Sequence, residues 1–203
     1  MAERLLLVRH ARIAAHCRGK LIGASDVPLD HSGEIQACGL AARVARWSPQ
    51  VCFSSPLRRC RQTASAAVPR LPVHLDADLS EINFGEWECR TFAEAAAGDP
   101  LLADRWAAFR PDFAFPGGES VDRFLRRVRA AADRLTRAEA STVLAVTHGG
   151  VMRAMMCYLL GLEPRHYVAF DAPYAAMAVI DLFGTRGVLA ALERPDAAGD
   201  GHG

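Results

Sequence analysis

Two stretches of the sequence place a histidine directly after an apolar run. Leu5–Val8 is followed by Arg9 and His10, and Thr142–Thr147 is followed by His148 and two glycines. One such stretch alone would be interpreted as the end of a buried strand. In an open α/β sheet, however, ligands bind beyond the carboxyl ends of the strands. The repeated pattern therefore predicts that both imidazoles can face one pocket.

A third stretch, CFSSPLRRCRQTA, adds arginines where a strand gives way to a helix. Backbone N–H groups in the first turn of a helix already favour an anion, and arginine side chains strengthen that preference. Together the three stretches predict a phosphate site. The six cysteines show no metal-ligand spacing, so we expect reduced thiols, no structural metal and no cofactor.

The elements that carry these residues follow from periodicity. Short apolar runs alternate with helical spacing, which indicates parallel strands connected by helices. The expected strands are Arg4–Val8, Val51–Ser54, Thr142–Thr147 and Ala176–Leu182. Two helices are expected from their start signals, one from an N-cap at Asp30 to about Trp47 and one from Ser55 and Pro56 to about Ala67. Two more are expected over the VMRAMMCYLL stretch and along the Arg-rich segment Arg123–Arg137. The latter is amphipathic, and its arginines should face outward.

Length and composition favour one compact unit. With 203 residues, of which 51% are hydrophobic and 23% charged, we expect a single domain over 1–195, a lid-like excursion over about 83–118 and a flexible tail over 196–203. A formal charge of +1 provides no field to attract nucleic acid or a membrane surface. Leu5–Val8 is too short for a signal-peptide core, so a cytoplasmic location is predicted.

Five motifs occur in the order VRHA, SSPLRRCRQT, LSEINFGEW, PGGES and VTHGG. Each is weak alone, but in this order and spacing they resemble the histidine phosphatase superfamily, the phosphoglycerate-mutase-like proteins, over roughly residues 4–185. The resemblance implies a three-layer α/β sandwich with a mainly parallel central sheet flanked by helices. It agrees with the alternation of strands and helices.

The resemblance also assigns roles to residues of this chain. It implies that His10 is a nucleophile that becomes phosphorylated, that Arg9 and Arg59 bind phosphate, that Glu81 is the acid–base carboxylate, and that His148 is the second pocket histidine. A cluster of cations can neutralise a phosphoryl group without a metal. Positive charge near the nucleophile should lower its pKa, and its other ring nitrogen needs a hydrogen-bond acceptor.

The chain departs from the family pattern at several positions. Ala11 stands where glycine usually follows the Arg-His pair, which would cost on the order of 1 kcal/mol if a positive φ is needed there. Cys89 replaces the glycine often seen after the FGxWE stretch. His16 stands where an asparagine often helps to hold phosphate, so it is either a substituted phosphate ligand or a loop histidine. Arg58 and Arg61 are interpreted as bystanders.

GASDVPL, INFGEWE and PGGES look most like the α-ribazole phosphatase branch of cobalamin biosynthesis and its broad-specificity relatives. The expected function is a metal-independent phosphomonoesterase acting on a small phosphorylated metabolite, with α-ribazole 5′-phosphate as the named candidate. The alternatives are a phosphoglycerate mutase, a sugar-phosphate phosphatase and a non-catalytic phospholigand-binding module. The sequence does not decide whether the protein is a monomer or a homodimer. Seven aromatic rings lie in or beside the excursion, and they either form its own small core or, for one or two of them, contact a flat leaving group: Phe84, Trp87, Phe92, Trp106, Phe109, Phe113 and Phe115.

Overall fold

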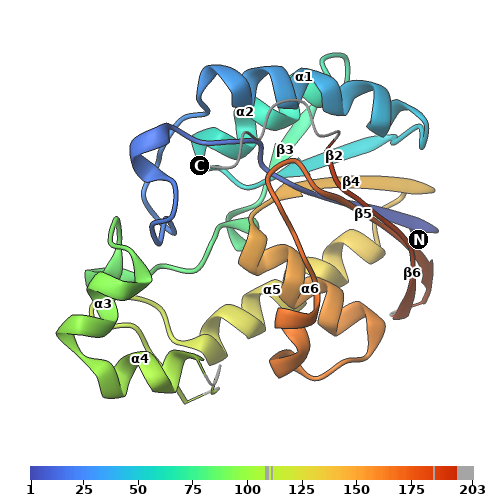
Figure 1. The fold of residues 1–203 in the computed structure, drawn as a ribbon. Helices are drawn as coiled ribbons and strands as arrows, with labels where there is room; N and C mark the ends of the chain where they lie inside the picture. Colours follow the sequence, from blue (N-terminus) through green and yellow to red (C-terminus); the bar gives the residue numbers. More distant parts are fainter. Residues whose placement is uncertain (108–109, 111, 185, 196–203) are drawn as a thin grey trace.

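A six-stranded sheet forms the centre of the computed structural model, which describes residues 1–107, 110, 112–184 and 186–195 (Figure 1). The strands are β1 (Arg4–Arg9), β2 (Val51–Ser54), β3 (Val73–Leu75), β4 (Thr142–Thr147), β5 (Met177–Phe183) and β6 (Arg186–Glu193). Their spatial order is β3-β2-β4-β1-β5-β6. The first four of these are mutually parallel, whereas β5 and β6 are antiparallel to their neighbours. The predicted, mainly parallel sheet is confirmed.

Helices cover both faces of the sheet. In Figure 1, α1 (His31–Ala45) and α2 (Arg58–Ala67) lie above it, and α5 (Val121–Thr136) and α6 (Gly149–Leu160) lie below it. The side chains of β1 divide between these two layers, because Leu5 and Leu7 join the core beside α5 and α6 while Leu6 and Val8 join the core beside α1 and α2. A strand buried on both faces reads as a continuous apolar run, which is the pattern seen in the sequence. The predicted sandwich is therefore confirmed.

The starts of α1 and α2 test two predictions. Asp30 caps α1 as predicted, since its carboxylate accepts a hydrogen bond from the Gly33 N–H at 2.6 Å. The prediction that the next helix begins at Ser55 and Pro56 is wrong, because α2 begins at Arg58. The Ser55 N–H donates to the carbonyl of Val146 at 3.0 Å and so extends the β2–β4 pairing by one residue.

The described residues between β3 and α5 add no strand to the sheet. It contains α3 (Phe92–Gly98) and α4 (Pro100–Ala107), which lie to one side of α5 in Figure 1. Four short 3-10 turns complete the described elements: η1 (Ala15–Cys17), η2 (Ala77–Leu79), η3 (Gly85–Trp87) and η4 (Pro164–Ala169). The predicted tail at 196–203 lies outside the described residues.

The prediction that the arginines of α5 face outward is wrong for one of them. Arg127 is only 16% exposed in its side chain and contacts the segment before α3, whereas Arg123, Arg126 and Arg129 are exposed. Within the described ranges, no helix is both long and apolar enough to cross a membrane.

Candidate active site

The register of the sheet brings the two strand-end histidines together. β1 and β4 are parallel and pair Arg9 with Thr147, so His10 and His148 follow at adjacent positions. The His10 N–H continues the pairing by donating to the carbonyl of Thr147 at 2.8 Å. The two imidazole rings meet edge to face with their centroids 5.2 Å apart. The carboxyl ends of these strands thus place both histidines in one location, as the sequence indicated.

His10 is held in one tautomer. Its Nδ1 lies 2.8 Å from the carbonyl oxygen of Ala11, and because a carbonyl only accepts hydrogen bonds, Nδ1 carries the proton. Nε2 is then unprotonated and can act as a nucleophile. Burial, followed by the positive charges of Arg9 and Arg59, holds the pKa of His10 well below its usual value. The neutral imidazole is therefore the stable form.

Arg59 lies in the first turn of α2 and is completely buried. Its two Nη groups donate to the carbonyls of Ser25 at 2.7 Å and Gly23 at 2.8 Å, and its Nε donates to Nδ1 of His148 at 3.2 Å. The Nε2–H of His148 then donates to the hydroxyl of Ser55 at 2.8 Å. Burial and then the charge of Arg59 lower the pKa of His148 well below its usual value. The structure thus places a fixed cation beside a neutral histidine.

Arg9 supplies the second cation of the site. Its Nη1 donates to the carbonyl of Ala172 at 2.6 Å, and its guanidinium carbon lies 4.1 Å from the centroid of the Tyr174 ring. Its Nε is buried and has no hydrogen-bond partner among the described residues. A buried donor without a partner costs free energy unless a ligand supplies the acceptor. This N–H is therefore suited to binding an anion.

Glu81 joins these four residues from the segment after η2. Its Oε2 accepts a hydrogen bond from the Gly150 N–H at 2.9 Å, and its Oε1 accepts one from the Ile82 N–H at 3.1 Å. Gly150 lies in the first turn of α6, where the helix dipole favours a carboxylate. A Cβ at position 150 would lie 2.5 Å from Oε1, so a larger residue there would displace the Glu81 carboxylate. Five of the six predicted site residues are thus brought together.

His16 is the exception. It lies exposed in η1, and in the described structure no hydrogen bond or ring contact joins it to the other five. Ser55 and Tyr174, which contact His148 and Arg9, were not predicted as site residues. Only the SSP motif hinted at Ser55, and no sequence pattern marked Tyr174. Arg58 and Arg61 are exposed on α2, in agreement with their interpretation as bystanders.

A cavity of about 270 Å³ adjoins Arg9 and Glu81. Its other lining residues are mostly apolar, with two additional cations: Lys20, Leu21, Ile22, Ile82, Phe84, Trp106, Phe124, Gly149, Gly150, Arg153 and Tyr167. Of the rings singled out in the sequence, Phe84 and Trp106 face this cavity. Both rings also pack against the buried cluster formed by Trp87, Phe113 and Phe115, with the Phe84 and Trp106 centroids 5.0 and 4.9 Å from that of Phe115. Phe92 is 45% exposed, and Phe109 lies outside the described residues.

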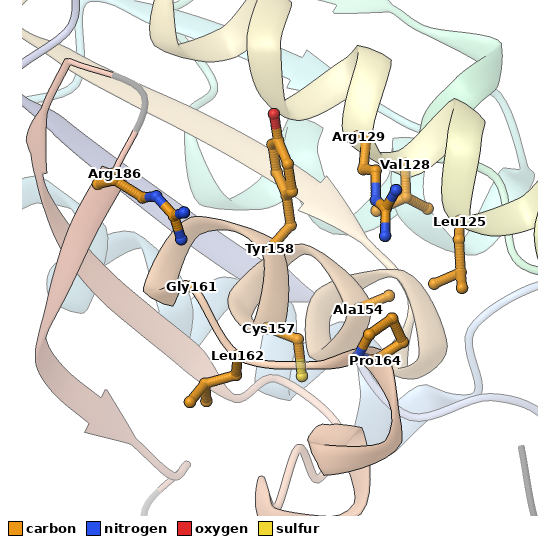
Figure 2. A pocket seen from close by; sticks show the side chains of 10 residues that line it. All are labelled: Leu125, Val128, Arg129, Ala154, Cys157, Tyr158, Gly161, Leu162, Pro164 and Arg186. Atoms are coloured by element: carbon orange, nitrogen blue, oxygen red, sulfur yellow. The ribbon is translucent and has the colours of Figure 1, made fainter.

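A second cavity, of about 330 Å³, lies between α5, the end of α6 and the start of β6 (Figure 2). It contains none of the six predicted site residues. Figure 2 shows Arg129 and Arg186 near it, on either side of Tyr158. Of the predicted site residues, Arg9 and Glu81 line the first cavity, whereas His10, Arg59 and His148 line neither cavity. The first cavity is therefore the one that adjoins the predicted site.

Across the described part of the chain, no group of three or more histidine, cysteine or carboxylate side chains could hold a metal ion. The Cys60 thiol touches His148, with 3.4 Å between Sγ and Nε2, and burial raises the pKa of Cys60 to about 12. It stays protonated and is therefore a poor nucleophile. The positive charges that act on His10 are those of Arg9 and Arg59.

The fold and these residues define a class of α/β proteins in which two strand-end histidines lie among buried arginines and a carboxylate. The sequence profile of the histidine phosphatase superfamily (branch 1) matches residues 5–194. The chain belongs to this superfamily, which confirms the resemblance found in its motifs.

Relatives with names extend this comparison. A bifunctional protein of Mycobacterium tuberculosis is 41% identical over 152 residues, which cover 71% of this chain and 41% of that protein, so the chain spans about two fifths of that relative's length. Phosphoserine phosphatase 1 of Hydrogenobacter thermophilus is 32% identical over 189 residues, covering 92% of this chain and 90% of that protein. The crystal structure of a putative α-ribazole-5′-P phosphatase from Escherichia coli matches with a TM-score of 0.86 and 26% identity, covering 96% of this chain and 97% of that one.

Proposed function

We propose that this protein is a metal-independent phosphomonoesterase that hydrolyses a small phosphorylated metabolite through a phosphohistidine on His10. The observation that carries the proposal is the fixed tautomer of His10, whose unprotonated Nε2 lies in a site with two arginines. All of the reacting groups come from one chain, so the proposal requires no second copy. We propose no nucleic-acid or membrane partner for this reaction, and we propose that it takes place in the cytoplasm.

The reaction has two steps. Glu81 enters the first step in its protonated form. Nε2 of His10 attacks the phosphorus, the bond to the leaving oxygen breaks, and the Glu81 carboxyl gives its proton to that oxygen. Glu81 then accepts a proton from water as the water oxygen attacks the phosphorus and the phosphorus–nitrogen bond breaks. Throughout, Arg9 and Arg59 hold the phosphoryl oxygens, and the unpartnered Nε of Arg9 gains its acceptor. His148 can join them only when its Nε2–H turns from the Ser55 hydroxyl to a phosphoryl oxygen.

The phosphohistidine can be trapped. Rapid quenching during turnover of a ³²P-labelled substrate should give acid-labile, base-stable label on the protein, and His10→Ala should abolish it. His74→Ala, which removes an exposed histidine of β3, is the matched control and should keep the label. EDTA should leave the rate unchanged and vanadate should inhibit. Label on a serine, aspartate or cysteine would contradict the mechanism.

For the substrate, we propose a monoester with a flat, largely apolar leaving group such as α-ribazole 5′-phosphate. Support comes from Phe84 and Trp106, whose rings line the cavity beside Arg9 and Glu81. The fold match to a protein titled a putative α-ribazole-5′-P phosphatase agrees with it. The alternative activity, that of a phosphoglycerate mutase, would require the site to keep water away from the phosphohistidine.

One observation favours a second candidate. Lys20 and Arg153 line the same cavity, and a carboxylate on the leaving group would pair with one of them. Phosphoserine carries such a group, and a relative is named a phosphoserine phosphatase. The cations therefore favour an acidic leaving group, while the rings favour a flat one.

A side-by-side phosphate-release assay separates the two. We expect α-ribazole 5′-phosphate to exceed phosphoserine, 3-phosphoglycerate and fructose 6-phosphate in kcat/KM by at least about tenfold. Trp106→Ala should reduce that advantage, whereas Arg153→Gln should lower kcat/KM mainly for phosphoserine. If phosphoserine is hydrolysed best and only Arg153→Gln matters, the second candidate replaces the first.

A further inference from the structure

The PGGES motif has so far been assigned no role. Its Glu119 forms a two-pronged ion pair with Arg127 of α5, in which Nε donates to Oε1 and Nη2 donates to Oε2, each at 2.8 Å. The Glu119 and Arg127 side chains are 9% and 16% exposed, so water screens the pair little. Two parallel charge-assisted hydrogen bonds also fix the orientation of the guanidinium plane.

The remaining donors of Arg127 bind backbone. Nη1 donates to the carbonyls of Ser80 at 2.6 Å and Asp78 at 2.9 Å, and Nη2 donates to the carbonyl of Glu81 at 3.1 Å. One guanidinium thus holds the chain directly before Glu81 and at Glu81 itself. A lysine could not reproduce this, because its three donors radiate from a single nitrogen.

Glu119 holds the chain on the other side of Glu81. Its backbone N–H donates to the carbonyl of Asn83 at 2.9 Å, and its Oε2 accepts from the Asn83 N–H at 3.4 Å. A cavity of about 370 Å³ lies along this segment and is lined by Ser80, Asn83 and Gly118 among others. Because a cavity lies on one side of the Ser80–Asn83 segment, side-chain packing covers only part of it. The hydrogen bonds from Arg127 and Glu119 therefore limit the movement of this segment.

We propose that Arg127 and Glu119 are positioning residues that hold Glu81 where it can protonate the leaving oxygen. The inference rests on the acid role of Glu81 in the proposed function. Proton transfer needs the carboxyl group within hydrogen-bond reach of the leaving oxygen, and small displacements of a catalytic group cost much of its effect. Arg127 touches neither the phosphoryl group nor the leaving oxygen in this role.

Leaving-group dependence distinguishes positioning from general stability. The first step is followed under single-turnover conditions with glycerol 3-phosphate, whose alkoxide needs a proton, and with p-nitrophenyl phosphate, whose phenolate needs little help. Arg127→Lys keeps a positive charge for Glu119 but loses the carbonyl contacts. We expect it to slow the alkyl substrate at least about fivefold more than the aryl substrate, with a smaller effect in the same direction from Glu119→Gln.

Any unfolded fraction lowers both rates equally, so the ratio stays informative in a destabilised variant. Arg134→Gln is the matched control, because Arg134 lies two turns further along α5 and binds the carboxylates of Asp76 and Asp78 rather than the backbone beside Glu81. Its ratio should stay within twofold of the wild-type ratio.

Glu81→Gln separates failure of this inference from failure of the proposed function. If Glu81→Gln slows the alkyl substrate selectively but Arg127→Lys and Glu119→Gln leave the ratio unchanged, the positioning role is overturned and the acid role stands. If Glu81→Gln slows both substrates equally, the acid role is overturned, and the positioning role with it.

Discussion

At the scale of single residues, the two positions where the resemblance expects glycine differ. Ala11 is buried, its N–H donates to the Thr63 hydroxyl at 3.0 Å, and it is not among the described non-glycine residues with positive φ. The alanine therefore carries none of the backbone strain considered for it. Cys89, in contrast, adopts a φ of 62°, in the left-handed region that favours glycine.

Cys89→Gly should therefore stabilise the protein, by about 1 kcal/mol, because it relieves the cost of the left-handed conformation. The measurement is the free energy of unfolding in urea. Cys89→Ala is the control, since it removes the thiol but keeps the Cβ that causes the strain. Equal stability of the glycine and alanine variants would show that the φ at this position carries no such cost.

The structure brings five of the predicted site residues together, and four of them lie where a strand ends or a helix begins. Glu81 follows the turn η2, and only the resemblance pointed to it. Ser55 was missed because its contact with His148 depends on which strands are neighbours, and that order is not local information. β2 lies beside β4 although almost ninety residues separate them (residues 54 and 142). His16 was included because of a motif position, but its exposure is set by the turn η1, which no periodicity marks.

At the scale of elements, strands and helices with strong local signals were predicted and the others were not. β6 contains LAALE, which favours helix by intrinsic propensity, yet it pairs with β5 as an antiparallel strand. β3 has only three residues, too few for a period to show. For α3 a signal was present, because Thr91 and Glu94 form a capping box.

Two glycines of α1 should respond oppositely to alanine. A Cβ at Gly33 would lie 1.9 Å from the carbonyl oxygen of Arg12, so Gly33→Ala should destabilise the protein by about 1 to 3 kcal/mol. It should also lower kcat, because shifting Arg12 moves Ala11, whose carbonyl holds His10.

Gly39 is exposed with nothing within 4 Å, so Gly39→Ala should stabilise by about 0.5 to 1 kcal/mol. Urea unfolding and steady-state kinetics measure both effects. A Gly33→Ala variant as stable as the wild type would contradict the packing of α1 against Arg12, and a destabilised Gly39→Ala variant would contradict the open space at Gly39.

At the scale of the whole molecule, the fold buries two neutral histidines among fixed cations, which links the reaction to stability. Burial and the arginines lower the pKa of His10 and of His148 well below the ordinary value of 6.5. As pH falls below 6.5, the unfolded chain takes up protons at these positions while the folded protein does not. Both histidines therefore contribute stability that is present above pH 6.5 and is lost as pH falls toward their folded pKa values.

This linkage predicts the pH dependence of unfolding. Between about pH 6.5 and 5, each buried histidine should make the free energy of unfolding fall by on the order of 1 kcal/mol per pH unit. His148→Gln should remove one such contribution, so its slope in this window should be shallower than that of the wild type, whatever its stability at pH 8. His16→Gln, which removes an exposed histidine, is the control for loss of a titrating side chain. Urea unfolding at a series of pH values measures the slopes, and parallel curves for wild type and His148→Gln would mean that His148 is protonated in the folded protein, where Arg59 could no longer donate to its Nδ1.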